Sequence, residues 1–200
     1  MTDTKTEWRR LLLRARHALG GSLRQAHSTL VVERVASLPH FAASRAVAVY
    51  VPLGAEVDPS ALEALAASEG KAVYLPGGDG GAAEWVRHVS PLTAGQAGKS
   101  STVRVTAIPE APLLLVVPGV GFDHYGTRLG RGRGFYDQAI AQLRKQSTLF
   151  AVGVAFEVQV VARLPKDPWD QAVDLVATER RLVIPERHSG SRRSEEVRES

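Results

Sequence analysis

Apolar residues in the first 38 positions recur three and four residues apart, which predicts two amphipathic helices. The apolar side of the first helix consists of Trp8, Leu11, Leu12, Ala15 and Leu19. Gly20-Gly21 interrupts this pattern. A second helix is expected from Ser22 to about Leu38, and it stops before Pro39 because proline cannot continue a helix.

Short apolar runs alternate with further helical segments in the rest of the chain. Strands are expected over residues 46–51, 72–75, 84–89, 113–117 and 149–155. Helices are expected from the Asp58-Pro59 cap to Ser68 and over residues 135–145. This alternation predicts an α/β fold: a single three-layer domain with a mostly parallel sheet covered by helices on both faces. We expect the domain to occupy residues 1–184, and residues 185–200, which are almost entirely polar, to form a disordered tail.

Composition narrows the class of protein. The chain has 200 residues, 44% of them hydrophobic, which suits one domain with a substantial core. It has no cysteine, so neither a disulfide nor a thiolate metal site can form. No apolar run is long enough for a signal peptide or a membrane span, and we therefore expect a cytoplasmic protein without a membrane partner. We also expect a monomer. The net charge of +4 is modest and suggests an anionic small molecule rather than nucleic acid.

The stretch from Val116 to Asp137 holds the strongest candidate chemistry. An apolar strand ends at Pro118, and a glycine-rich loop leads through Gly134 into the helix that begins at Phe135. Glycines let backbone amides approach a ligand closely, and a helix N-terminus adds unpaired amides and a positive dipole end. The loop also carries three arginines, Arg128, Arg131 and Arg133. This combination predicts an anion site for a polyphosphate, although the loop is neither a Walker A loop nor a dinucleotide fingerprint; the alternative is a solvated turn or a loop that contacts RNA.

Several residues outside the loop are weaker candidates. Lys5 and Arg9 are four positions apart and share a helix face, which by itself usually means a solvated surface. Glu56 follows a strand at its carboxyl end, where open α/β sheets bind ligands. Tyr50 and Trp85 are aromatic residues that could stack on a flat ligand, and each could equally belong to the core. His88 and His124 lack partners at metal-ligand spacing, so a zinc site is not proposed.

Three segments together resemble the 5-formyltetrahydrofolate cyclo-ligase family, also called methenyltetrahydrofolate synthetase. The first is P-G-V-G-F-D at 118–123 followed by G-T-R-L-G-R-G-R-G-F-Y-D at 126–137. The second is Y-V-P-L-G-A-E-V at 50–57, and the third is the segment 164–179, which begins with Leu-Pro and ends with Thr-Glu. The resemblance extends from about Lys5 to Glu179. The chain departs from the family at Trp169, where histidine is common, and at Phe135, where tyrosine is frequent.

The resemblance implies an ATP-dependent ligase that cyclises 5-formyltetrahydrofolate to 5,10-methenyltetrahydrofolate through phosphorylation of the formyl oxygen, with ATP and Mg2+ as cofactors. It implies that Arg131 and Arg128 are catalytic and that Asp137 and Asp170 bind the metal. The expected ATP site comprises Lys5, Arg9, Arg128, Gly130, Arg131, Gly132, Arg133, Gly134, Phe135 and Tyr136. The expected folate site comprises Glu56, Arg9, Arg131, Phe135, Tyr50 and Trp85.

Two other functions are compatible with the same residues. A paralogue could keep the ATP site and act on a different substrate. A small nucleic-acid-binding module could use the arginines and aromatic residues of the R-G-R-G-F-Y stretch, and it would need neither Lys5 nor Glu56 nor Asp170.

Overall fold

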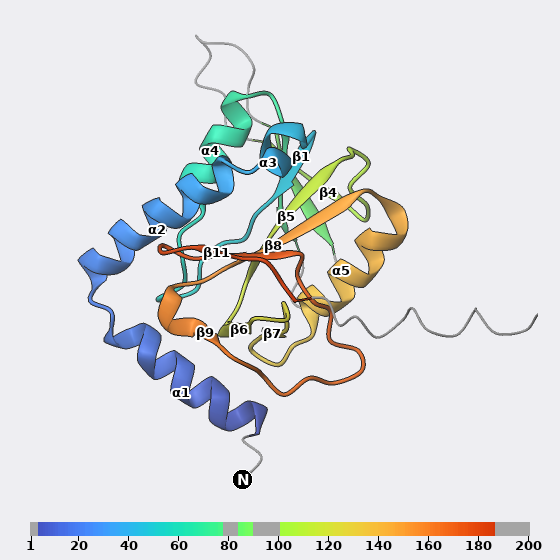
Figure 1. The fold of residues 1–200 in the computed structure, drawn as a ribbon. Coiled ribbons are helices and arrows are strands. Elements are labelled where there is room, and N and C mark those ends of the chain that lie inside the picture. Colours follow the sequence, from blue (N-terminus) through green and yellow to red (C-terminus); the bar gives the residue numbers. More distant parts are fainter. Residues whose placement is uncertain (1–3, 78–83, 90–100, 187–200) are drawn as a thin grey trace, which may run out of the picture.

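A mixed, mostly parallel sheet forms the centre of the molecule (Figure 1). The structure is a computed structural model that describes residues 4–77, 84–89 and 101–186. The eight strands of the sheet are, in spatial order, β11 (Leu182–Val183), β10 (Leu175–Ala177), β8 (Leu149–Val154), β5 (Leu113–Pro118), β1 (Ala46–Ala48), β2 (Ala72–Pro76), β3 (Trp85–Val89) and β4 (Ser101–Val105). The five strands from β10 to β2 are parallel, and the antiparallel strands β11, β3 and β4 lie at the edges.

Helices cover both faces of this sheet, so the predicted three-layer α/β fold is confirmed. One face packs against α2 (Gly21–Ala36), α3 (Pro39–Ala43) and α4 (Ser60–Ser68), and the other packs against α5 (Phe135–Gln146) (Figure 1). The core has two halves, one on each face of the sheet, and the side chains of β5 alternate between them. Leu114 and Val116 belong to the first half, whereas Leu113, Leu115 and Val117 belong to the second. A strand buried on both faces needs the continuous apolar run that the sequence shows here.

A smaller sheet lies beside the main one and supports the glycine-rich loop. It consists of β7 (Arg128–Leu129), β6 (Gly121–Asp123) and β9 (Val160–Val161), and β9 follows the short helix η1 (Glu157–Gln159). The N-terminal helix α1 (Lys5–Ala18) begins with a capping box formed by Thr4 and Glu7, and it packs along this smaller sheet through Leu12 (Figure 1).

Several expected boundaries change in the structure. The first strand ends at Ala48 rather than Val51. The last hydrogen bond to the neighbouring strand is from Val49 N to Tyr74 O, at 2.9 Å, and beyond this point the chain leaves the sheet. A short helix, α3, starts at Pro39, where only a helix end was expected. Asp58 is not the N-cap of α4; Pro59 takes that position, and the Asp58 carboxylate accepts from Ser60 N at 3.0 Å. The strands β4, β6, β7, β9 and β11 were not predicted.

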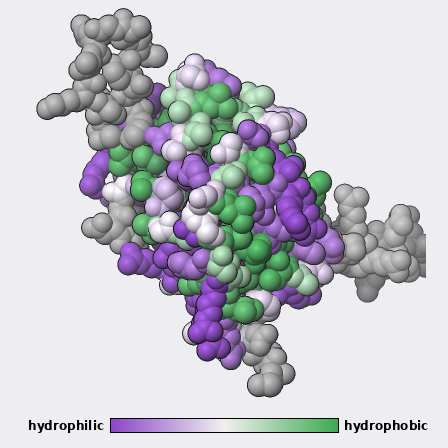
Figure 2. Space-filling view, turned by 90° about the vertical axis from the view of Figure 1, so that its left-hand side faces the viewer, coloured by the Kyte–Doolittle hydropathy of each residue, from purple (hydrophilic) through white to green (hydrophobic). Residues whose placement is uncertain are grey.

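The surface mixes polar and apolar residues. Figure 2 shows one face, on which apolar patches lie between hydrophilic ones. None of the helices within the described ranges is long and apolar enough to cross a membrane. The expected polar tail falls outside the described residues from position 187 onward.

Candidate active site

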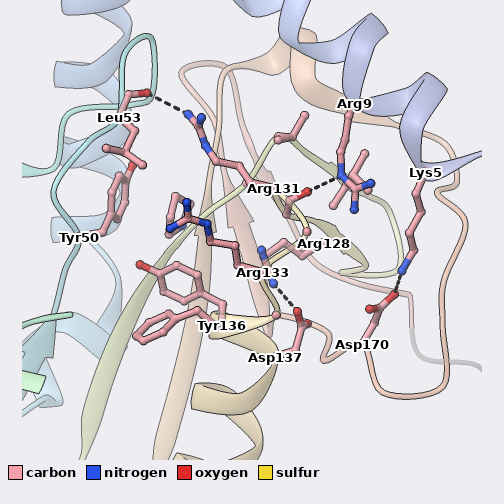
Figure 3. A pocket seen from close by; sticks show the side chains of 18 of the residues that line it. Lys5, Arg9, Tyr50, Leu53, Arg128, Arg131, Arg133, Tyr136, Asp137 and Asp170 are labelled. Atoms are coloured by element: carbon pink, nitrogen blue, oxygen red, sulfur yellow. Dashed lines mark hydrogen bonds and ion pairs between the residues drawn. The ribbon is translucent and has the colours of Figure 1, made fainter. Parts of the chain in front are cut away.

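A cleft of about 480 Å³ opens at the carboxyl ends of the central parallel strands, where the sequence pattern placed the ligand. This volume lies within the range of small-molecule sites. Segments that are far apart in the sequence meet there (Figure 3). Their lining residues include Lys5, Arg9, Tyr50, Val51, Leu53, Glu56, Pro118, Gly119, Val120, residues 128–137, Asp167, Trp169 and Asp170.

The glycine-rich loop forms the floor of the cleft and ends at the N-terminus of α5. Gly134 is the N-cap residue of α5 and has a φ of 68°, a left-handed conformation that glycine adopts without strain. No side chain caps this helix end, so the first-turn amides of α5 remain available to a ligand. Gly130 has a different role, because a Cβ atom there would lie 2.4 Å from the Arg128 guanidinium.

Arg131 extends across the cleft and pairs with Glu56, which lies on the opposite wall. Its Nη2 and Nε atoms lie 2.9 and 3.1 Å from Glu56 Oε1. Nη2 also donates to Leu53 O at 3.1 Å (Figure 3). The Glu56 side chain is only 7% exposed, whereas that of Arg131 is 47% exposed. The second Glu56 oxygen accepts from Leu53 N at 3.0 Å. Two residues that were both expected in the folate site, one of them also in the ATP site, are thus in contact with each other.

Arg128 and Asp137 form a second pair, which lies deeper. Arg128 Nη2 donates to Asp137 Oδ2 at 2.7 Å, and the Tyr136 ring packs 5.5 Å from the guanidinium carbon. Burial lowers the pKa of Arg128, and the negative charge of Asp137 opposes that shift. The other Asp137 oxygen accepts from Gln171 N at 3.1 Å. Although Arg128 borders the cleft, its charge is already compensated by Asp137.

Lys5 lies between two carboxylates at the far end of the cleft. Its Nζ is 2.5 Å from Asp170 Oδ2 and 2.7 Å from Asp167 Oδ2 (Figure 3). Burial acts to lower the pKa of Lys5, but hydrogen bonds and charge interactions with both aspartates raise it overall. Asp170 Oδ2 also accepts from Asp167 N at 2.8 Å, which fixes the loop that carries it.

Arg9 and Arg133 supply the remaining positive charge. Arg9 Nε donates to Gly130 O at 2.8 Å, so α1 is tied directly to the glycine-rich loop (Figure 3). Arg133 also lines the cleft, and it has no ion pair or hydrogen bond within the described part of the chain. The cations of the cleft therefore differ in how strongly they are paired within the protein. Arg133, which has no such partner among the described residues, is the most available to bind a ligand.

The aromatic candidates separate into cleft walls and core. Phe135 and Tyr136 line the cleft and contact each other edge to face at 5.0 Å between ring centroids. Tyr50 borders the cleft, but its hydroxyl donates to Val57 O at 2.6 Å and only its ring can face a ligand. Trp85 does not line the cleft: it is 1% exposed and packs behind Phe135 at 5.9 Å. The expectation that Trp85 stacks on the substrate is therefore corrected, because its indole packs in the core with Tyr74 and Ile108.

The expected metal ligands, Asp137 and Asp170, are both present at the cleft. The described residues contain no cluster of three histidine, aspartate or glutamate side chains that could hold a metal ion. Magnesium does not require one, since it keeps several waters and commonly uses one or two carboxylates together with substrate phosphates. Asp170 Oδ1 accepts no hydrogen bond from the described residues, which leaves it available as a ligand. The free oxygen of Asp170, together with Asp137, whose two oxygens also accept from Arg128 Nη2 and Gln171 N, therefore fits a hydrated magnesium ion held by one or two carboxylates.

Two residues of the site were missed by sequence reasoning. Asp167 lies in the segment 164–179 that resembles the family, but only Asp170 of that segment was assigned a role, and the fold brings Asp167 to Lys5. Arg16 is 1% exposed and lies behind Glu56, with Nη1 at 3.9 Å from Glu56 Oε1. A signal for Arg16 was available, because it is seven residues after Arg9 and shares its helix face.

Comparison with known proteins gives the same family along the chain. The model of the 5-formyltetrahydrofolate cyclo-ligase family matches residues 1–179. The chain is 29% identical over 187 residues to the 5-formyltetrahydrofolate cyclo-ligase of Escherichia coli K12, which covers 84% of this chain and 96% of that protein. It is 27% identical over 192 residues to that of Mycolicibacterium smegmatis, covering 90% and 96%. The NMR structure of Aquifex aeolicus 5,10-methenyltetrahydrofolate synthetase superposes with a TM-score of 0.72 at 36% identity, covering 94% of this chain and 98% of the other.

Proposed function

The chain belongs to the 5-formyltetrahydrofolate cyclo-ligase family, as the sequence motifs predicted, and we propose from this that it closes 5-formyltetrahydrofolate to 5,10-methenyltetrahydrofolate at the expense of ATP. The prediction of a ligase is confirmed by the family. The observation that carries the finer proposal is the meeting of an uncapped helix N-terminus, several cations and the Glu56 carboxylate around one cleft. Such a cleft suits an anionic nucleotide beside a substrate that carries N–H donors.

The chemistry explains why a nucleotide is needed. The N-formyl group is an amide, and its oxygen is a poor leaving group at neutral pH. In the proposed reaction the formyl oxygen attacks the γ-phosphorus of ATP and ADP leaves. The neighbouring anilinic nitrogen then attacks the formyl carbon and loses its proton, and the oxygen departs with inorganic phosphate. The protein must hold donor and acceptor in line and neutralise the charge of the phosphoryl group.

The phosphate side of the proposed site is the end of the cleft where α1 meets the glycine-rich loop. Arg9 and Lys5 lie at this end, and the first-turn amides of α5 line the same cleft. Arg133 points toward Tyr50, so it would have to turn to reach the phosphates (Figure 3). Arg131 can reach the phosphates by leaving Glu56, since its side chain is 47% exposed and extends from a glycine-flanked position. Asp170 and Asp137 would hold magnesium, which neutralises phosphate charge when bound.

The folate side is the end of the cleft that contains Glu56. A carboxylate can accept two parallel hydrogen bonds from a pterin ring, in the way that it accepts them from a guanidinium. Tyr50, Phe135 and Tyr136 provide flat apolar surfaces around it. Val51 and Leu53 are 64% and 56% exposed at the rim, where they can cover the aromatic part of the substrate.

Turnover assays test this proposal directly. Purified protein is mixed with 5-formyltetrahydrofolate, ATP and magnesium, and formation of the methenyl product is followed by its near-ultraviolet absorption. Omission of ATP should abolish product formation. Arg131→Ala should lower kcat about 100-fold or more, the usual effect of removing a group that stabilises transition-state charge. The matched control is Arg10→Ala, an exposed arginine on α1 that does not line the cleft. A folded wild-type protein that forms no product, or forms it without ATP, contradicts the proposal.

A further inference from the structure

One face of α1 reaches the cleft at its N-terminal end and continues into the protein behind the cleft. Lys5, Arg9, Leu12 and Arg16 are spaced four, three and four residues apart, which places them in one stripe. Lys5 contacts Asp170, Arg9 contacts Gly130 O, and Leu12 fills the space that Gly121 leaves open, since a Cβ there would lie 2.3 Å from Leu12 Cδ1. Arg16 is the innermost member of the stripe. Unlike the two cations before it, it is buried and does not line the cleft.

Arg16 has few partners for a buried charge. Its Nη1 lies 3.5 Å from Gly119 O and 3.9 Å from Glu56 Oε1, and its Nε has no hydrogen-bond partner among the described residues. Burial lowers the pKa of Arg16, and Glu56 is the strongest of the groups that oppose this shift. A buried guanidinium is costly unless an anion compensates it. Glu56 is the only carboxylate within ion-pair distance of Arg16 in the described part of the chain.

Glu56 consequently lies between two arginines that differ in freedom. Arg131 approaches from the cleft side and is 47% exposed, so it can move to another anion. Arg16 approaches from the protein side, is 1% exposed and is enclosed by α1 and the residues after β5. Whenever Arg131 leaves Glu56, the carboxylate keeps Arg16 as its counter-ion. Leu53 N, which donates to Oε2, fixes the second oxygen.

We propose that Arg16 is a positioning residue for folate: it acts through Glu56, whose carboxylate it compensates and orients while Arg131 serves the phosphates. This inference rests on the proposed function and adds a residue that does not touch either substrate. Arg16 also connects the three walls of the cleft, namely α1, the Glu56 loop and the end of β5 at Gly119. Its loss should weaken folate binding and leave the nucleotide end of the cleft largely intact.

Steady-state kinetics of Arg16→Gln and Arg16→Lys test the proposal. We expect Arg16→Gln to raise KM for 5-formyltetrahydrofolate about tenfold, the effect of one weakened charged interaction, with KM for ATP changed by less than about twofold. Arg16→Lys keeps the positive charge and should recover part of the loss. Arg14→Gln is the matched control, because Arg14 lies on the same helix, is exposed and is not in the stripe. It should leave both KM values unchanged.

A double-mutant cycle with Glu56→Gln separates positioning from a merely structural role. If Arg16 acts through the Glu56 charge, either Arg16 substitution in the Glu56→Gln background should change the folate KM by less than about twofold. Additive effects, or equal changes in both KM values, would overturn the inference and leave the proposed function intact. Should Arg16→Gln fail to fold, Arg16→Lys completes the same cycle. Wild-type protein that neither binds 5-formyltetrahydrofolate in a calorimetric titration nor converts it would instead refute the proposed function, and this inference with it.

Discussion

The Arg128 guanidinium and the Asp137 carboxylate form a 2.7 Å ion pair beneath the glycine-rich loop, with side chains only 5% and 15% exposed. Asp137 was expected from the sequence to serve a metal ion, and in the structure it also compensates a buried charge. Its removal therefore affects stability as well as chemistry. A buried arginine that loses its partner is destabilising, because nothing replaces the lost compensation.

We predict that Asp137→Ala lowers the free energy of unfolding by about 3–5 kcal/mol, the usual cost of breaking a buried pair. Urea denaturation followed by circular dichroism measures this change. The matched control is Glu84→Gln, which removes a surface pair to Arg104 whose side chains are 45% and 74% exposed. That change should cost less than about 1 kcal/mol. Equal effects of the two substitutions would show that the Arg128 pair contributes no more than a surface pair.

Unlike Asp137→Ala, Arg131→Ala should leave the stability of the protein almost unchanged. Its side chain is 47% exposed, so removing it should alter the free energy of unfolding by less than about 1 kcal/mol, while most of the activity is lost. Thermal melting and turnover measured on the same preparation check both expectations. A variant that loses stability and activity together would indicate that Arg131 supports the loop rather than the reaction.

The central elements were predictable because their patterns are local. β5 is a continuous apolar run, and α5 follows a glycine at its N-cap, so both were predicted to within a residue or two. The expected cations and carboxylates also lie around one cleft. The smaller sheet was not predictable, since β7 and β9 have two residues each and exist only because β6 lies between them.

The ion pairs within the site could not be predicted from the sequence either. The motifs predicted Lys5, Arg131, Glu56 and Asp170 as ligand-binding groups, and nothing in their spacing indicated that Lys5 would meet Asp170 or that Arg131 would meet Glu56. These contacts join residues 165 and 75 positions apart. Trp85 shows the converse: its sequence context was ambiguous, and only the register of β3 directs its side chain into the core.

Alkaline pH should destabilise the protein through its buried tyrosines. Burial is the main cause that raises the pKa values of Tyr50, Tyr74 and Tyr136 above the ordinary value of 10.0. The folded protein then retains protons that the unfolded chain releases, so this stabilisation is fully present below pH 10 and is lost as the pH rises further. Each tyrosine should reduce the free energy of unfolding by about 1.4 kcal/mol per pH unit in that range.

Spectrophotometric titration of the phenolate band checks this prediction. In the native protein these three tyrosines should not ionise until the fold is lost, whereas in denaturant all four tyrosines of the chain should titrate near their ordinary value. Identical native and denatured titration curves would contradict the assigned burial. Tyr136→Phe should shift the alkaline unfolding midpoint to higher pH, because it removes one of the groups that release a proton on unfolding.

Trp169 offers an optical probe of the cleft. The chain has three tryptophans. Trp169 is 69% exposed and lines the cleft next to Asp170, whereas Trp85 is 1% exposed in the core and Trp8 is partly buried against the Leu12 cluster, outside the cleft. Ligand binding should therefore change mainly the Trp169 emission, and addition of ADP with magnesium should quench it or shift it to shorter wavelength. Trp169→Phe should remove most of this change. An undiminished signal in that variant would mean that the nucleotide does not approach Trp169.

The same position tests whether the departure from the family pattern matters. The Trp169 side chain makes no hydrogen bond to the described residues; only its backbone oxygen accepts, from Gln171 Nε2 at 3.3 Å. Trp169→His, which restores the residue common in the family, should consequently leave kcat unchanged. It should alter KM for ATP by at most about tenfold, since a single aromatic contact contributes about 0.5–1.5 kcal/mol. A large loss of kcat in Trp169→His would place the indole among the groups that orient the reacting phosphate rather than at the rim.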